Sequence, residues 1–242
     1  MNRTRLRLSS VVVMALAVGL RADEVPAVGA KEMFFDPQRG VAEASTASTP
    51  AKITDEDGRR IAQLSPETPI LGLSYWIELI AGAGKRGVHV TDDRAFRSGE
   101  RIRLHFRGNA DGRIVIVQLG TSGASTVLFP DAGKGLGQNR IRANRDHVLP
   151  SEAHWFRFDD KAGTEKLLVL FARNQEELDR AFPTQPVMDP TETATLLRAV
   201  RQSRGGKDLL IEKETREPSE IGDYVVNVAG KPIALEIALA HR

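Results

Sequence analysis

Apolar and polar side chains alternate with a period of two along several short segments between residues 71 and 239. In the segment 101–107 (RIRLHFR), every second residue is apolar, so an extended chain puts its large apolar side chains on one side. The segment 73–79 alternates in the same way, whereas 113–119 is almost continuously apolar, as is typical of a strand covered on both faces. This periodicity predicts paired strands and argues against a helical fold.

Short turns rich in glycine separate the predicted strands. We expect the strands 101–107, 113–119 and 125–129 to form an antiparallel meander, and Gly230-Lys231-Pro232 to close a hairpin between the last two strands. Proline and capping signals predict two short helices within about 174–204. The expected fold is therefore mostly β: an antiparallel β-sandwich, immunoglobulin-like, with two short helices near the C-terminal part.

The N-terminal residues differ from the rest of the chain. Residues 1–22 have the pattern of a secretory signal peptide: a basic start, an uncharged apolar run and small residues after it. The run is about half of the roughly 20 residues that span a membrane, and an uncleaved anchor is the alternative. Residues 23–70, poor in large apolar groups over most of their length, are expected to form a flexible tether, and 71–242 a single domain.

Charge is interpreted after removal of the predicted signal. The whole chain has a formal net charge of +2, from 34 basic and 32 acidic residues. Residues 1–22 hold four arginines and no acid, so the remainder has 30 basic and 32 acidic residues, a net charge of −2. This excludes a generally basic surface, and no nucleic-acid partner is expected. We expect an exported, periplasmic or extracellular protein with no stable membrane span after cleavage.

Several short motifs in the central part of the chain occur together. They are Phe96, Ser98-Gly99-Glu100, Asp111-Gly112, the apolar strand 114–119, Gly123, Leu128-Phe129-Pro130-Asp131, Asn139, Ile141, Pro150 and Gly163-Thr164-Glu165. On the basis of these motifs, residues 72–180 resemble the bacterial domain of unknown function 4384. The resemblance implies an all-β sandwich that occurs in exported proteins, or beside kinase-like or caspase-like domains, with no catalytic residues to carry over. Arg113 and Val115 depart from the family, which often has an aromatic residue after the Asp-Gly turn.

Reactive side chains do not form a recognisable catalytic or metal-binding motif. Ser122 lies in GTSGAS, which lacks the second glycine of a hydrolase elbow and is interpreted as a hairpin turn. His147 and His154, with Asp159 and Asp160, follow no zinc spacing. No catalytic residue, metal site or cofactor is therefore expected. The chain has no cysteine, so disulfides and lipid attachment at a cysteine are excluded.

Basic side chains form two candidate binding surfaces. Lys134, Arg140, Arg142 and Arg145 make the long connection 130–154 locally basic, so an anionic ligand is a hypothesis there. A second set, Arg101, Arg103, Arg107 and Arg113, is interpreted either as a docking face or as a solvated sheet surface.

Three other polar or aromatic residues receive structural interpretations. His105 is expected to be solvated among the arginines of its strand. Trp76 and Trp155 are expected to pack within the core or between the sheets.

Three functions remain open at this point. The favoured one is a non-enzymatic module of the bacterial envelope that binds an unidentified protein or an anionic polymer. The alternatives are an exported hydrolase and a sensor or accessory subunit of an envelope signalling or secretion system; the latter follows from the family resemblance alone.

Overall fold

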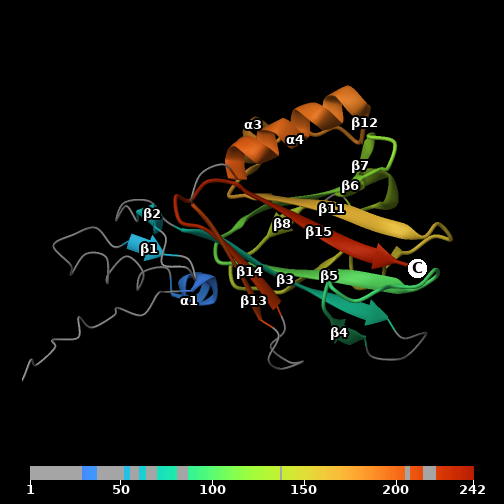
Figure 1. Ribbon diagram of the computed structural model, residues 1–242, viewed down its shortest axis with the longest axis horizontal. Helices are drawn as coiled ribbons and strands as arrows, with labels where there is room; N and C mark the ends of the chain where they lie inside the picture. The colour runs from blue at the N-terminus through green and yellow to red at the C-terminus, as the bar shows by residue number, and fades with distance from the viewer. Residues whose placement is uncertain are drawn as a thin grey trace, which may run out of the picture.

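The computed structural model describes residues 29–36, 52–54, 60–63, 70–80, 87–136, 138–204, 208–214 and 222–242. The predicted signal peptide lies outside these residues and stays a prediction. The fold is mostly β, with two antiparallel sheets facing each other as a sandwich, as the alternation predicted (Figure 1). Among the described residues, no helix combines the length and the apolar composition needed to cross a bilayer.

The first sheet has the strand order β10-β5-β3-β14-β13, with β4 also paired to β3 and β9 to β5. Its strands are β3 (Leu71–Ile80), β4 (Val88–Val90), β5 (Arg101–Gly108), β9 (His147–Leu149), β10 (Phe156–Arg157), β13 (Leu209–Glu214) and β14 (Gly222–Asn227). In β3 and β5 the buried residues alternate with less buried ones over most of their length, so the predicted inward faces are confirmed.

The second sheet has the order β12-β7-β6-β11-β15, with β8 also paired to β6. Its strands are β6 (Gly112–Leu119), β7 (Ser125–Phe129), β8 (Arg140–Ile141), β11 (Gly163–Ala172), β12 (Val187–Met188) and β15 (Ile233–His241). A short 3-10 helix, η1 (Ala132–Lys134), lies in the connection after β7. The helices α3 (Gln175–Ala181) and α4 (Pro190–Arg204) cover the outer face of this sheet, within the segment predicted to be helical (Figure 1).

Two predicted hairpins are wrong, because consecutive strands enter different sheets. β5 belongs to the first sheet and β6 to the second, so the expected meander is reduced to the β6–β7 hairpin. The chain passes from one sheet to the other at Gly112. A residue with a side chain would not fit there, because a Cβ at this position would lie 2.5 Å from the carbonyl oxygen of Ala172. Likewise β14 and β15 lie in different sheets, and Gly230, with φ +65°, belongs to the connection between them.

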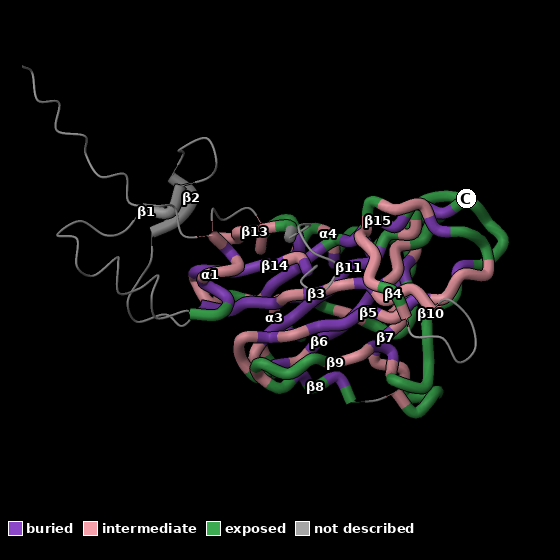
Figure 2. Tube along the Cα trace, turned by 90° about the horizontal axis from the view of Figure 1, so that it is seen from below, coloured by how far each residue is buried: buried purple, intermediate pink, exposed green. Residues whose placement is uncertain are grey.

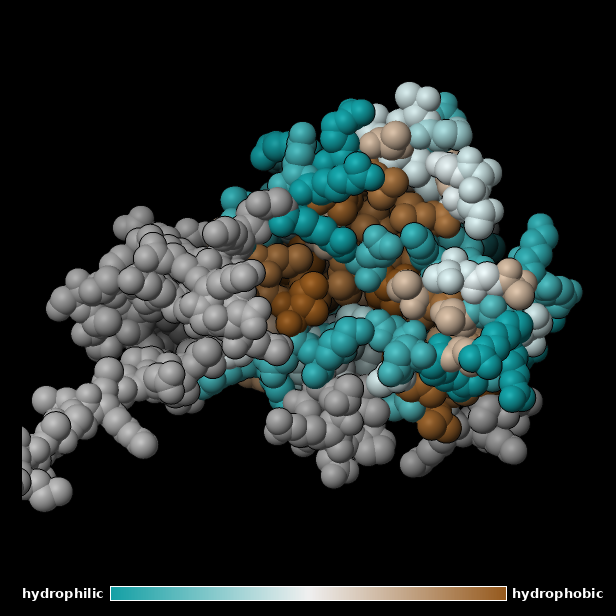
Figure 3. All heavy atoms as spheres, viewed as in Figure 1, coloured by the Kyte–Doolittle hydropathy of each residue, from teal (hydrophilic) through white to brown (hydrophobic). Residues whose placement is uncertain are grey.

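The main core lies between the sheets, and a second apolar layer lies under the helices. Buried residues run along the central strands of both sheets (Figure 2). Phe96, Phe106 and Phe171 are fully buried in the first layer. The second layer joins outward-facing residues of β6 and β11 to Leu178 and Leu196 of the helices. This double cover explains why 113–119 is apolar on both faces. In the space-filling view, apolar residues remain visible in the band between the layers, bordered by hydrophilic ones (Figure 3).

The expected tether, residues 23–70, contains ordered structure. Helix α1 (Ala30–Phe35) buries Met33 and Phe34 against Tyr224 of β14 and residues near it. Two strands, β1 (Lys52–Thr54) and β2 (Arg60–Gln63), pair with each other. The apolar patch in α1 is therefore part of the folded body, because its large side chains complete a small core on the outer face of the first sheet.

Candidate functional site

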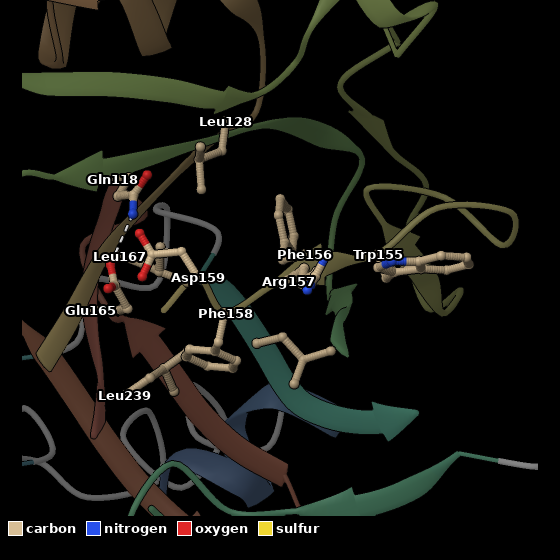
Figure 4. A pocket seen from close by; sticks show the side chains of 11 residues that line it. Gln118, Leu128, Trp155, Phe156, Arg157, Phe158, Asp159, Glu165, Leu167 and Leu239 are labelled. Carbon is tan, nitrogen blue, oxygen red and sulfur yellow. Dashed lines mark hydrogen bonds between the residues drawn. The ribbon is translucent and has the colours of Figure 1, made fainter. Parts of the chain in front are cut away.

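A cleft of about 340 Å³ opens between the two sheets at the end of the sandwich that contains β10 (Figure 4). It is lined by Ile102, Gln118, Leu128, Trp155, Phe156, Arg157, Phe158, Asp159, Glu165, Leu167 and Leu239. The lining comes from both sheets: β5 and β10 lie on one side, and β6, β7, β11 and β15 on the other. The cleft therefore combines an aromatic rim, an apolar wall and several polar groups.

The rim of the cleft carries an exposed tryptophan. Trp155 precedes β10, and 41% of its surface is exposed. The guanidinium carbon of Arg101 lies 4.6 Å from the centroid of its ring, within the range of a cation–π contact. The expectation that Trp155 packs in the core is wrong, because Phe158 fills the inward position of this segment instead. Trp155 is thus a flat apolar surface available at the mouth of the cleft.

The inner part of the cleft carries two carboxylates. Gln118 Nε2 of β6 donates a hydrogen bond of 2.8 Å to Glu165 Oε2 of β11. Asp159, which follows β10, directs its carboxylate toward Glu165 and Gln118 (Figure 4). Single ligand atoms of Asp159, Glu165 and His241 all lie within 4.8 Å of one another. Asp159 and Glu165, which are six positions apart, therefore form one polar cluster with His241 near the C-terminal end of the sequence.

Strand pairing brings Glu165 and His241 together. Glu165 pairs with Leu239 across β11 and β15, and His241 lies two residues further along the same face of β15. A hydrogen bond of 3.1 Å joins His241 Nε2 to Ser98 Oγ. Asp159 reaches them from the other layer, and its Oδ1 accepts a hydrogen bond of 2.8 Å from the backbone N–H of Lys161. The cluster consequently depends on how the two sheets are placed against each other.

The four residues of the predicted basic ligand site are not brought together as one group. Lys134 pairs with Asp131 at 2.8 Å, and Arg140 with Asp111 at 3.0 Å. Of the four, Arg140 and Arg142 line a second hollow of about 630 Å³, whereas Lys134 and Arg145 do not.

The Arg140 interaction also has an electrostatic effect. A backbone hydrogen bond from Ala143, followed by the hydrogen bond from Arg140, lowers the pKa of Asp111 below its usual value. Part of the expected positive charge is thus already neutralised by the protein's own carboxylates.

The predicted docking face is divided between the two sheets. Arg101, Arg103 and Arg107 lie on the outer side of β5, whereas Arg113 lies in β6 and donates to Asn139 Oδ1 at 3.3 Å. Arg103 is occupied internally, since it donates to the carbonyl oxygen of His154 and to the Glu78 carboxylate. Arg101 is the member of this set that contacts the rim of the cleft.

A partly buried aromatic cluster lies on the outer face of the first sheet, so the prediction that Trp76 packs in the core or between the sheets is wrong. The Trp76 ring lies between the rings of His89 and His105, with centroids 3.5 Å away on each side. His105 is only 7% exposed and bonds Asp146 Oδ2 at 2.8 Å and Glu78 Oε2 at 3.2 Å. The prediction that His105 is solvated is wrong, because strand pairing places it beside Trp76 and the chain before β9 covers it.

The remaining reactive side chains lie in local turns. Ser122 is exposed in the β6–β7 hairpin turn, as expected, where Gly120 N–H donates to the Ala124 carbonyl. His147 Nε2 accepts from the Arg142 backbone N–H, and His154 Nδ1 bonds Ser151 Oγ. Each histidine is therefore engaged within its own loop.

Comparison with known proteins identifies one part of the chain. No curated protein and no solved structure matches the chain. Residues 95–175, which extend from the segment before β5 through β11 to the first residue of α3, match the family described as "Domain of unknown function (DUF4384)", the family that the sequence motifs resemble.

Proposed function

We propose that the protein is an exported, non-enzymatic binding module of the bacterial envelope, and that its cleft holds a hydroxyl-rich polymer such as a glycan. The observation that carries this proposal is a single cleft with the exposed Trp155 ring at its rim and with Gln118, Asp159 and Glu165 at its other end (Figure 4). A rigid aromatic ring offers a large contact surface at low entropic cost. The amide and the carboxylates supply the few polar groups that orient a ligand in a mostly apolar cleft.

The charge of the cleft favours a neutral polymer. Asp159 and Glu165 outnumber Arg157 among the lining residues and would repel an anionic chain, and Arg101 is already stacked on Trp155. An anionic polymer would instead have to use the hollow beside Arg140 and Arg142, where Arg140 is paired with Asp111. The cleft is therefore the better binding surface, and export is supported by the signal-like pattern of residues 1–22.

The two carboxylates of the cleft are the feature on which the alternative of a hydrolase depends. Glycosidases that use two carboxylates hold them about 5–5.5 Å apart in retaining enzymes and about 6.5–9.5 Å apart in inverting enzymes. Carboxylate oxygens of Asp159 and Glu165 lie within 4.8 Å of each other. Carboxyl groups held about 5–5.5 Å apart also have oxygens this close, so an assay distinguishes the alternatives: glycan cleavage that is lost in Glu165→Gln would support a hydrolase, and retention without cleavage supports binding alone.

The proposal is tested with immobilised neutral envelope polysaccharides and the Trp155→Ala variant. If Trp155 is the main binding residue, as proposed, its truncation should cost about 2 kcal/mol, so the dissociation constant should rise about 30-fold. Ile211→Ala is the control, because Ile211 is also exposed but lies on β13 at the other edge of the first sheet. Equal affinity of Trp155→Ala and the unmodified protein, or no retention on any polymer, would contradict the proposal.

A further inference from the structure

We propose that the inner part of the cleft is a binding site for a transition-metal dication, with Asp159, Glu165 and His241 as its protein ligands. Nothing in this inference depends on polymer binding, and it adds a bound ion to the proposed function. The three side chains offer two carboxylate oxygens and one imidazole nitrogen, all within 4.8 Å of one another. Ligand atoms about 2.1 Å from a tetrahedral ion lie roughly 3.4 Å apart, so small side-chain rotations would close the site.

His241 provides an observation that is independent of the acidic residues. It is only 4% exposed, and among the described residues its buried Nδ1 atom has no hydrogen-bond partner. A buried polar atom without a partner destabilises the fold, and such atoms are rare in folded proteins. A bound cation would satisfy Nδ1.

The other nitrogen of His241 is already held. Its Nε2 lies 3.1 Å from Ser98 Oγ. When Nε2 carries the hydrogen and donates it to Ser98, Nδ1 presents its lone pair, which is the form that binds metals. Histidine ligands usually donate their second N–H in this way, and the contact fixes the orientation of the ring.

Hydrogen bonds also hold the two carboxylates in place. Gln118 Nε2 donates to Glu165 Oε2, and the backbone N–H of Lys161 donates to Asp159 Oδ1, each at 2.8 Å. These bonds orient each carboxylate and leave Glu165 Oε1 and Asp159 Oδ2 as ligands. Supporting contacts of this kind surround known metal sites.

The ligand set indicates the class of ion. Two carboxylates neutralise a dication, and an imidazole ligand favours zinc, copper, iron or nickel over calcium and magnesium, which prefer oxygen. Three protein ligands leave a position for water or for an oxygen of a bound molecule. Because Asp159 follows β10 while Glu165 and His241 lie on β11 and β15, the ion would also join the two layers at their open end.

The test is calorimetric titration of the full-length, chelator-treated protein, without a polyhistidine tag, with Zn²⁺. Absorption spectra with Co²⁺ report the coordination. We expect one ion per chain, visible Co²⁺ bands and a higher melting temperature. Asp159→Asn, Glu165→Gln and His241→Gln should each weaken binding by more than the roughly 10–100-fold that follows loss of a supporting contact. Asp160→Asn and His154→Gln are matched controls and should bind like the unmodified protein.

The outcomes separate this inference from the proposed function. Circular dichroism shows whether a variant is folded, and Asp159→Asn changes an exposed residue, so its lost binding would not reflect unfolding. Equal Zn²⁺ affinity in all variants, or binding of Ca²⁺ but not Zn²⁺, would overturn the metal site. Zinc binding without polymer retention would leave the ion site standing while the proposed function fails, and the reverse result would do the opposite.

Discussion

At the scale of single residues, Asp223 has the most consequential environment among the described acidic groups. Its Oδ2 accepts a hydrogen bond of 2.7 Å from the Tyr75 hydroxyl, and Lys213 Nζ lies 3.6 Å away. Burial raises the pKa of Asp223 above its ordinary value of 3.8, against the opposing effects of Tyr75 and Lys213. The folded protein therefore holds this proton more tightly than the unfolded chain does.

This pKa shift predicts a dependence of stability on pH. Because the folded-state pKa is the higher one, the stabilising contribution of Asp223 is present below pH 3.8 and is lost as the pH rises through the raised value. Asp223→Asn removes the titration while keeping an acceptor for Tyr75. Urea unfolding across this acid range should show the variant gaining stability relative to the unmodified protein as the pH rises. Parallel curves for the two proteins would contradict the shift.

The candidate site shows why the sequence alone did not predict which residues lie together in it. The sequence analysis weighed Asp159 as a metal ligand only with His147, His154 and Asp160 and expected no metal site, whereas its neighbours in the cluster lie in strands 163–172 and 233–241. No spacing rule joins such residues, because their proximity follows from pairing in the second sheet and from the packing of the first sheet over it. His105 was misjudged for the same reason, since its partners lie on other segments.

At the scale of elements, the sequence predicted most strands and both C-terminal helices but not all the partners of the strands. A period of two determines which side chains share a face, and it carries no information about the neighbouring strand. For β5 the nearest predicted partner was β6, yet β5 pairs with β3 from Leu73 to Ile80. Short turns were taken as hairpins, although two of them carry the chain from one sheet to the other.

Helix α4 gives an element-scale prediction. Leu196 is fully buried in the apolar layer over β6 and β11. Leu196→Ala leaves a cavity there, and such substitutions cost about 2–5 kcal/mol of unfolding free energy. The loss is measured by chemical denaturation. Arg198→Ala, on the exposed side of the same helix, is the control and should change the unfolding free energy by less than about 0.5 kcal/mol.

At the scale of the whole molecule, the folded body begins upstream of the predicted domain. Met33 is fully buried, and α1 packs over β14, so residues before 71 contribute to stability. Met33→Ala should lower the unfolding free energy by about 2–5 kcal/mol, whereas Phe35→Ala, at a position 56% exposed, should lower it less. Equal unfolding curves for Met33→Ala and the unmodified protein would show that α1 contributes nothing to the fold.

The pairing of β3 with β14 sets the order in which the protein can fold. Tyr75 and Asp223, which face each other across these strands, are 148 residues apart in the chain. The first sheet therefore cannot close until β14 has been synthesised, and folds with such distant contacts form slowly, on a scale of milliseconds to seconds. During this time the nascent chain stays unfolded. An unfolded chain can pass through a narrow secretion channel, as the proposed export requires.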